Sequence, residues 1–395
     1  MRVRVYLNCE GIRDLAGILD DRNNEIVFQY APVFIQKKLQ LSPFGAPLGT
    51  QLIKGKSHAR GLPGFIADSL PDGWGNLLLD RQLRRLGLRL DLVSPLERLC
   101  WIGRQGMGAL EYEPESSLRE IKSESIALDV LAEEASLLLQ NGDIEELDDL
   151  CELNGSSGGE RPKIVCLVNE KKTKIIRGTF AHDGFVPWII KFRSTYDAPD
   201  QGVQEYICSK LARKAGIDVP DSHLFSSKRG KGWFGCRRFD RTPRGKLHTV
   251  TVAGLLDCDF RFPCLDWESV LILTRRLAGR SAMLEQLRRC VFSYMVGNVD
   301  DHAKNFSFLM NREGRWHISP MYDCVPTDQK GEHMTAILGK GSRIGRSDIV
   351  VLAEKFDVTT KQAEGIIDAV AQAVSFYPAF AKRYGVKVPE GVQVF

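Results

Sequence analysis

The hydrophobic periodicity of the chain changes along its length, and this change limits the folds that it can adopt. In residues 1–114, short runs such as Arg2 to Leu7 and Glu25 to Tyr30 alternate apolar and polar side chains between turn-rich segments. Strict alternation is typical of half-buried strands. After the strand expected around Trp233 to Phe239, apolar side chains recur instead at helical spacing over long stretches. The sequence therefore predicts an α+β protein that is β-rich toward its N-terminus and helical in its last part.

The length of the chain predicts more than one structural unit. Its 395 residues are long for a single hydrophobic core, so about two or three units are expected. Hydrophobic residues make up 43% and charged residues 26%, which is the balance of an ordinary globular protein. Neither an internal repeat nor a long Gly/Ser-rich or Pro-rich linker separates the units. We therefore expect them to pack against one another.

Net charge and cysteine content indicate which partners and which cellular compartment to expect. The formal net charge of +4 is small for this size, so composition alone requires no nucleic-acid or membrane partner. The ten cysteines are scattered, and the nearest pair, Cys258 and Cys264, lacks the further ligands of a zinc site, which favours free thiols. No apolar run resembles a signal peptide or approaches the roughly 20 residues of a membrane span. We expect a protein of the reducing cytoplasm.

The middle of the chain combines a loop of small residues with strand and helix signals. The loop, Gly155 to Lys163, is accompanied by the strand candidates Ile164 to Asn169 and Phe185 to Phe192. Val203 to Ala215 has the apolar spacing of a helix. Trp74, in the segment Pro71-Asp72-Gly73-Trp74, is expected in the core, where large aromatic side chains usually lie. Further helices are predicted over Ser123–Gln140, Ile144–Leu153, Trp267–Leu277, Met283–Val296, Ser347–Phe356 and Thr359–Tyr384.

The segment that carries the most chemical information follows an apolar helix and contains Asp300 and Asn305. Phosphoryl transfer to a hydroxyl group needs a carboxylate that accepts its proton and an oxygen ligand for magnesium, and kinases place these residues as Asp-x-x-x-x-Asn. Asp300 and Asn305 have this spacing. Asp301 is one position off, so we assign it a lesser role.

A second carboxylate is needed because metal ions must offset the charge of the β- and γ-phosphates. Asp323 is the candidate, since it ends the apolar run that starts at Trp316 and that is expected to return as a strand beside the Asp300 segment. Taken singly, each aspartate has a simpler explanation: Asp300 as a helix cap and Asp323 as the start of a turn.

A nucleotide site also needs cations. Lys191 ends the strand candidate Trp188-Ile189-Ile190-Lys191-Phe192, where its apolar neighbours suggest pairing with an anion, and Glu205 on the next helix could position it. The alternative is a lysine at a surface edge. The Gly155 to Lys163 loop offers backbone N–H groups and two cations suited to phosphates. It matches neither standard phosphate-loop pattern, so an ordinary surface loop is its alternative.

Taken together and in this order, these segments resemble the HipA family, the kinase toxins of bacterial toxin–antitoxin pairs. The resemblance covers nearly the whole chain. It is carried by DHAKNFSF (301–308), HISPMYD (317–323), WIIKF (188–192), GSSGGERPK (155–163) and, more weakly, GLPGFIADSLPDGWG (61–75). It implies a protein-kinase-like bilobal fold with an all-helical C-terminal lobe at residues 246–395. An accessory subdomain at 1–112 and a kinase N-lobe at 113–245 would precede that lobe.

The resemblance also implies roles for single residues in an ATP- and Mg2+-dependent serine/threonine kinase. Asp300 would be the catalytic base, Asn305 and Asp323 the magnesium ligands, and Lys191 the phosphate ligand. Family members autophosphorylate a serine of the mobile loop, which adds charge at the nucleotide site. This points to Ser156 or Ser157, of which we prefer Ser156. Further nucleotide contacts would come from Lys163, Ser157, Gly158, Gly159, Glu205, Arg237, Phe239, His302 and Lys304, with Cys236–Phe239 as the adenine-binding hinge.

The implied partners are a HipB-like helix-turn-helix antitoxin, through which alone DNA would be bound, and a protein substrate of the translation apparatus. Two alternatives remain open from the sequence. A small-molecule or lipid kinase would use the same residues near the metal. A non-catalytic DNA-associated repressor subunit would use the basic stretch Lys228 to Lys246, which contains Asp240 as its single acidic residue. The simpler explanation of that stretch is a solvated hairpin that includes part of the nucleotide site.

Overall fold

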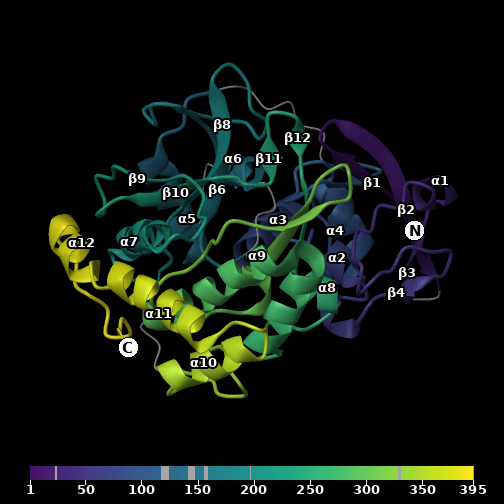
Figure 1. Cartoon of the computed structure of the whole chain (residues 1–395). Coiled ribbons are helices and arrows are strands. Elements are labelled where there is room, and N and C mark those ends of the chain that lie inside the picture. The colour runs from purple at the N-terminus through teal and green to yellow at the C-terminus, as the bar shows by residue number, and fades with distance from the viewer. Residues whose placement is uncertain are drawn as a thin grey trace.

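The computed structural model of the chain describes residues 1–22, 25–116, 124–140, 147–154, 159–195, 197–327 and 331–394. One sheet lies in the N-terminal part, a second lies in the middle part, and long helices gather in the C-terminal part (Figure 1). This arrangement confirms the predicted α+β class. Within the described ranges, no helix combines the length and apolar character needed to cross a bilayer.

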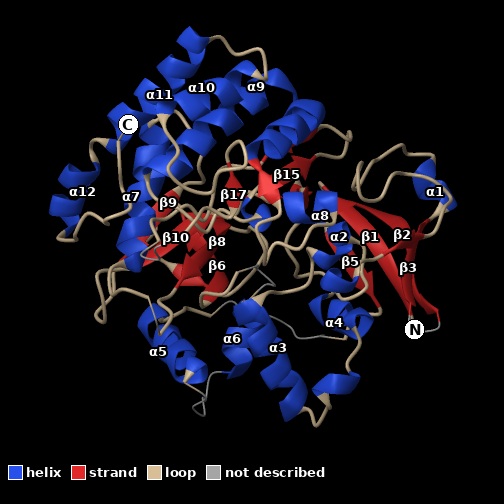
Figure 2. Cartoon of the chain, turned by 90° about the horizontal axis from the view of Figure 1, so that it is seen from below, coloured by secondary structure: helices blue, strands red, loops and turns tan. Residues whose placement is uncertain are grey.

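The N-terminal part is built on a five-stranded antiparallel sheet of order β4-β3-β2-β1-β5. The alternation that predicted strands places Val3, Val5, Leu7 and Cys9 of β1 in the core. Short helices lie beside this sheet (Figure 2). The strands are β1 (Arg2–Cys9), β2 (Ile12–Arg22), β3 (Glu25–Tyr30), β4 (Ile53–Lys54) and β5 (Leu110–Glu113), and the helices are α1 (Pro32–Ile35), α2 (Gly64–Ala67), α3 (Gly73–Arg85) and α4 (Pro95–Ile102).

The middle part holds a second five-stranded sheet of order β7-β6-β8-β10-β9. Its strands are β6 (Lys163–Asn169), β7 (Ile175–Ile176), β8 (Phe185–Lys191), β9 (Ser222–Phe225) and β10 (Trp233–Arg237), and its helices are α5 (Leu128–Leu139), α6 (Leu147–Leu153) and α7 (Gln201–Lys214). The two predicted strands and the helix after them are confirmed. The predicted helix from Ser123 begins only at Leu128, because Ser125 instead forms a β-bridge with Ile176.

The C-terminal part is mostly helical, with one correction to the all-helical expectation. A three-stranded sheet and a parallel strand pair lie within it, and they frame the segments that contain Asp300 and Asp323. The strands are β13 (His248–Thr251), β15 (Ser307–Met310) and β16 (Trp316–Ile318), then β14 (Leu265–Asp266) and β17 (Thr335–Ala336), after the short pair β11 (Arg241–Thr242) and β12 (Gly245–Lys246). The strand predicted next to the Asp300 segment is confirmed as β16.

The helices of this part follow the periodicity, with one further division. The two helices expected over 267–277 and 283–296 are confirmed, because Gly279, with a φ of 85°, interrupts the helical backbone between them, and the bounds of α9 span both. The helix expected over 359–384 is divided at Ser375 and Phe376. The elements are α8 (Val252–Leu256), α9 (Trp267–Met295), α10 (Arg346–Glu354), α11 (Thr360–Val374) and α12 (Tyr377–Tyr384).

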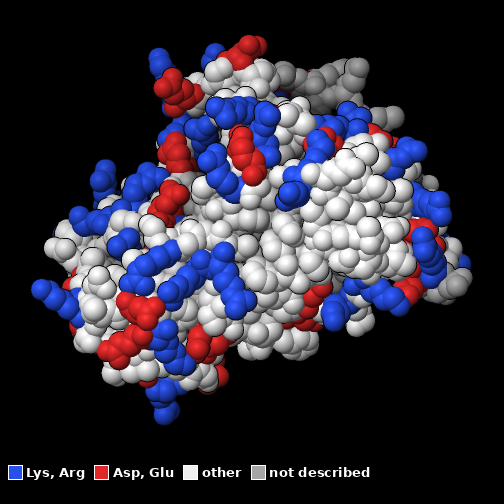
Figure 3. Space-filling view, turned by 45° about the vertical axis from the view of Figure 1, so that its right-hand side comes forward, with Lys and Arg blue, Asp and Glu red and all other residues white. Residues whose placement is uncertain are grey.

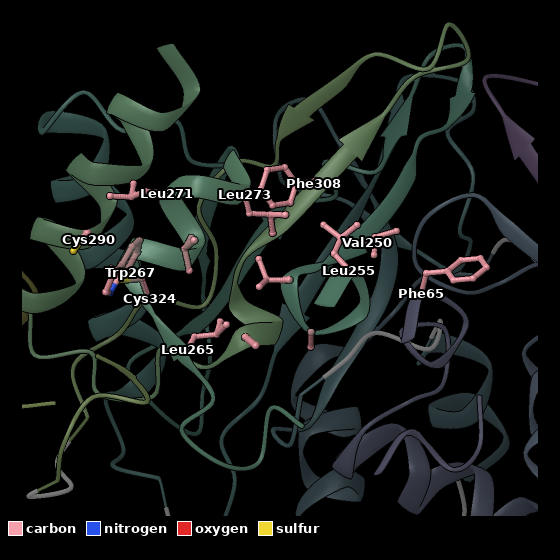
Figure 4. Packing of buried hydrophobic residues seen from close by; sticks show 14 of the residues in the cluster. Phe65, Val250, Leu255, Leu265, Trp267, Leu271, Leu273, Cys290, Phe308 and Cys324 are labelled. Carbon is pink, nitrogen blue, oxygen red and sulfur yellow. The ribbon is translucent and has the colours of Figure 1, made fainter. Parts of the chain in front are cut away.

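The hydrophobic core joins the three parts of the chain. Phe65 of the N-terminal part belongs to the same hydrophobic cluster as Val250 and Leu255 of the C-terminal part, and Figure 4 shows it near them. A second cluster places Trp74 of α3 among residues of α5, α6, β6 and β8. The core position expected for Trp74 is confirmed, because its side chain is 1% exposed. Its indole N–H donates a hydrogen bond to the Lys163 carbonyl at 3.1 Å.

Candidate active site

Lys191 forms ion pairs that connect the middle and C-terminal parts. At the end of β8, its Nζ lies 2.6 Å from Oε1 of Glu205 on α7 and 2.5 Å from Oδ1 of Asp323. Because β8 lies between β6 and β10, the surface-edge alternative for this lysine is wrong. Burial alone lowers the pKa of Lys191, but Asp323 and Glu205 outweigh burial and hold that pKa above its usual value. The amine is therefore charged and already directed at anions.

The segment between α9 and β15, residues 296–306, forms a short loop, here called the Asp300 loop. It closes with a 3-10 turn, Ala303–Asn305. Asn305 Nδ2 donates a hydrogen bond of 2.7 Å to the backbone carbonyl of Asp300, which fixes the spacing of the two candidate residues. Asp300 is open to solvent at its surface. Surrounding protein atoms nevertheless raise its pKa, and the nearby negative charge of Asp323 adds to this rise.

Asp301 anchors the Asp300 loop to the rest of the C-terminal part. Its carboxylate is buried, with Oδ2 at 2.9 Å from Nδ1 of His333 and Oδ1 accepting the backbone N–H of Thr335 at 3.1 Å. The ring of His333 stacks on Tyr294 of α9. These contacts direct Asp301 away from Asp300 and are consistent with the lesser role that we expected for it.

Two hydrogen bonds hold Asp323 next to the Asp300 loop. The hydroxyl of Tyr322 donates to the carbonyl of Lys304 at 2.6 Å, and the N–H of Ser319 donates to the carbonyl of Ser307 at 2.9 Å. Asp323 itself has a φ of 53°, a left-handed conformation that aspartate tolerates better than most residues. In this conformation its carboxylate meets Lys191, and the positive charges of Lys191 and Lys163 outweigh burial to hold its pKa well below the usual value.

The phosphate loop predicted over 155–163 is described from Gly159 onward, so Gly155, Ser156, Ser157 and Gly158 lie outside the described residues. Gly159 has a φ of 96°, and a Cβ on it would lie 2.5 Å from Nζ of Lys163. The lysine amine therefore packs directly against the glycine backbone. Burial, aided by the nearby charge of Lys191, lowers the pKa of Lys163 to about 8.

Asp72 is a site residue that the sequence interpretation missed. It stands at the N-cap of α3, but its carboxylate makes no capping hydrogen bond. Instead it accepts two hydrogen bonds from Nζ of Lys304, at 2.7 and 2.9 Å, and one from the N–H of Gly159 at 3.4 Å. An N-terminal residue thus bridges the Asp300 loop and the phosphate loop. The only local signal was an aspartate before a helix, which normally indicates a cap.

Four further residues were predicted to contact the nucleotide, and they differ in their distance from Asp323 and in their exposure to solvent. Lys304 is held by Asp72, and Nδ1 of His302 accepts the backbone N–H of Lys304 at 3.3 Å. The ring of Phe239 lies 5.4 Å from that of Tyr322, which places the predicted hinge beside Asp323. Arg237 is exposed at the end of β10. The roles of these four residues toward a nucleotide stay predictions.

The basic stretch Lys228 to Lys246 is solvated only in part: five of its eight basic residues are exposed, and Arg238, Arg241 and Lys246 are buried. Asp240 is fully buried and accepts hydrogen bonds from the buried guanidinium groups of Arg238 and Arg241. Lys246 is also buried, 2.8 Å from Glu111 of β5. Basic and acidic groups are interspersed on the face that Figure 3 presents. The three buried basic residues therefore join parts of the chain, and the exposed ones lie at the surface as the solvated-hairpin interpretation expected.

Profiles of two protein families match the chain: the HipA N-terminal domain over residues 5–113 and the HipA-like C-terminal domain over residues 155–376. The chain belongs to the HipA family. It is 24% identical to Y4dM of Sinorhizobium fredii strain NGR234, covering 95% of this chain and 90% of that protein. It is also 24% identical to the serine/threonine-protein kinase toxin HipA of Shewanella oneidensis, covering 72% of this chain and 67% of that toxin.

A solved structure shows the same HipA fold. It is the Shewanella oneidensis complex of HipA, HipB and operator DNA, which this chain matches with a TM-score of 0.68 at 19% identity. The match covers 97% of this chain and 90% of that one. The protein-kinase-like fold predicted from the sequence is thereby confirmed.

Proposed function

We propose that this HipA-family protein is an ATP- and Mg2+-dependent serine/threonine-protein kinase. The observation that carries the proposal is the pairing of Lys191 with both Glu205 and Asp323, at 2.6 and 2.5 Å, next to a loop that presents Asp300. A kinase needs a lysine for the phosphates, a carboxylate that positions the lysine and a carboxylate for the metal. These three groups come from three separate segments of this chain.

The residues present fit a magnesium ion. Asp323 offers a carboxylate, and Asn305 offers an amide oxygen because its Nδ2 already donates to Asp300. Hard oxygen donors of this kind are what Mg2+ prefers, usually with substrate phosphates and water as its other ligands. Among the described residues, no group of three or more His, Cys, Asp or Glu side chains is placed to hold a metal by itself. This fits an ion that phosphates help to bind. When bound, the ion would offset the phosphate charge.

The chain's own residues would divide the work as follows. Lys191 would hold the phosphates while Glu205 keeps its amine in place, and Lys163 with Gly159 would contact them from the phosphate loop. Asp300 would accept the proton of the acceptor hydroxyl, for which a partly exposed carboxylate beside other charges is suited. Asp72 would keep the Asp300 loop and the phosphate loop in register through Lys304.

The test is incubation of the full chain with γ-labelled ATP and magnesium, alone and with a cell extract as acceptor. Label should appear on serine or threonine of protein and should fall about 100-fold or more in Asp300→Ala, since a positioned base typically contributes that much. Asp91→Asn, an exposed change in the N-terminal part, is the matched control and should retain transfer. Label on metabolites or lipids alone would show that the protein is a kinase of another substrate class.

We also propose that the kinase autophosphorylates in its Gly/Ser loop, on Ser156 or Ser157. Support comes from the next described residue of the loop, Gly159, whose N–H bonds Asp72 and which lies against Lys163. Phosphosite mapping after incubation with ATP and magnesium should find one of the two serines occupied. Comparison of Ser156→Ala with Ser157→Ala assigns the position, and an unmodified loop in an active enzyme would refute the idea.

A cytoplasmic toxin–antitoxin role is the wider setting that we propose. The support is the fold match to a HipA protein that was solved with HipB and operator DNA. A HipB-like helix-turn-helix antitoxin from the adjacent gene should co-elute with this chain in gel filtration. Phosphoproteomics of cells that express the wild type or Asp300→Ala should reveal the substrate, which we propose is a protein of translation.

A further inference from the structure

Two cysteines of the C-terminal part have their sulfur atoms in contact at the protein surface. Sγ of Cys264 lies 3.1 Å from Sγ of Cys258, six positions earlier in the chain. This distance is about 1 Å longer than a disulfide bond. Cys264 is exposed and Cys258 is partly buried. The pair is therefore close enough to bond after a small movement and open enough to meet a reagent.

This pair differs from the other thiols of the chain. Six cysteines are buried, and burial raises the pKa of thiols such as Cys100 and Cys166, which makes them poor nucleophiles. The hydrogen bond that Cys258 shares with Cys264 has different effects on the two thiols, since it lowers the pKa of the exposed Cys264 and raises the pKa of Cys258. An accessible thiol with increased thiolate character and a neighbouring resolving cysteine is the arrangement found in redox-active pairs.

We propose that Cys258 and Cys264 form a reversible intrachain disulfide by exchange with a low-molecular-weight disulfide such as oxidised glutathione. The Cys264 thiolate attacks one sulfur of that disulfide, which breaks its S–S bond and releases one thiolate. Cys258 then loses its proton and attacks the Cys264 sulfur, which releases the second small thiolate. The two protein thiols together lose two electrons and two protons. The small disulfide gains both electrons, and the protons end on the two released thiols.

The new bond would lie in the wall of a cleft next to the Asp300 loop. Cys258 and Phe260 line this open cleft between the N-terminal and C-terminal parts, together with Arg60, Asp72 and Lys304. The ring of Phe260 lies 4.4 Å from Nζ of Lys304 and 5.3 Å from the ring of His302. A disulfide would join the chain on both sides of Phe260, so it would restrain the segment that packs on the Asp300 loop.

The test uses the full chain and does not depend on kinase activity. The protein is treated with oxidised glutathione, its remaining thiols are blocked with iodoacetamide, and its peptides are mapped by mass spectrometry. We expect the peptides that carry Cys258 and Cys264 to be linked, with the loss of two hydrogen atoms, and dithiothreitol to restore alkylation at both. Cys100, buried in the N-terminal part, is the internal control and should stay reduced.

Single variants separate the two steps of the exchange. In Cys258→Ser, Cys264 should retain glutathione as a stable mixed disulfide, whereas in Cys264→Ser, Cys258 should stay largely reduced. Circular dichroism checks that both variants fold, and the wild-type map decides the matter by itself if they do not. Full alkylation of both thiols after oxidant, a persistent glutathione adduct on wild-type Cys264, or a disulfide-linked dimer in place of the intrachain bond would each overturn the proposal.

Discussion

Asp72→Asn tests whether the N-terminal part controls the Asp300 loop. The substitution keeps the shape of the side chain but removes the charge that holds Nζ of Lys304 at 2.7 and 2.9 Å. Both side chains are 16% exposed, so the pair lies between a surface and a buried ion pair. Exposed pairs contribute about 0.2–1 kcal/mol and breaking a buried pair costs about 3–5 kcal/mol. Because the Asp72–Lys304 pair is partly exposed, we expect a loss of unfolding free energy between these two ranges, about 2 kcal/mol.

The assay is a double-mutant cycle that combines Asp72→Asn with Lys304→Met, followed by urea denaturation of the four proteins. Each single variant should lose about 2 kcal/mol of unfolding free energy. The double variant should lose little more than either single one, because the pair is already broken. In phosphoryl transfer, 2 kcal/mol corresponds to a reduction of about thirtyfold in kcat/KM if the pair acts wholly on the reactive geometry.

Asp91→Asn is the matched control for the same chemical change. Its ion pair with Arg89 also lies in the N-terminal part, but the two side chains are 62% and 73% exposed. Stability and transfer should therefore change little. The reasoning is refuted if the losses of Asp72→Asn and Lys304→Met simply add, since additive effects mean that the two residues act independently.

Three further predictions follow from buried groups. The depressed pKa leaves the Lys163 amine charged below about pH 8 and neutral above it. The affinity for ATP, measured by calorimetry, should therefore fall as the pH rises through about 8. The Lys163→Met variant should lack this pH dependence. Asp240→Asn removes the carboxylate charge that pairs with the buried Arg238 and Arg241, so urea denaturation should show a loss of about 3–5 kcal/mol. A loss below about 1 kcal/mol would contradict the buried pairing. Trp74→Phe loses the hydrogen bond to the Lys163 carbonyl and part of the indole volume, so a drop of about 1–3 kcal/mol is expected, with an unchanged midpoint counting against it.

The sequence predicted the part of the site that depends on local spacing. Asp300 and Asn305 are joined by a hydrogen bond within one loop, so their separation along the chain determines their separation in space. Asp323 follows β16, whose antiparallel pairing with β15 brings it back to that loop. The strand that carries Lys191 was predicted from its run of apolar residues. Elements whose position follows from periodicity and short connections are those that one sequence can specify.

The features that were missed depend on contacts across long sequence separations. Asp72 meets Lys304 from 232 positions away, and a helix cap was the ordinary expectation for an aspartate at that place. The basic stretch was expected to face solvent, because its sequence does not indicate that three of its basic side chains are buried in ion pairs with Asp240 and Glu111. The contact of Cys258 with Cys264 is close in sequence, but it depends on the conformation of an irregular loop, which periodicity does not predict.

These long-range contacts show that the N-terminal part is joined to both the middle and the C-terminal parts of the chain. Its Trp74 lies in the core of the second sheet, its Glu111 pairs with Lys246, and its Asp72 binds the Asp300 loop. Removing it would expose apolar surface of both lobes and leave the Lys246 and Lys304 amines without these carboxylates, at a combined cost of several kcal/mol. A binding event that shifts the N-terminal part would therefore reach the Asp300 loop directly through Lys304. A partner that binds the N-terminal part alone thus has a physical route to control phosphoryl transfer.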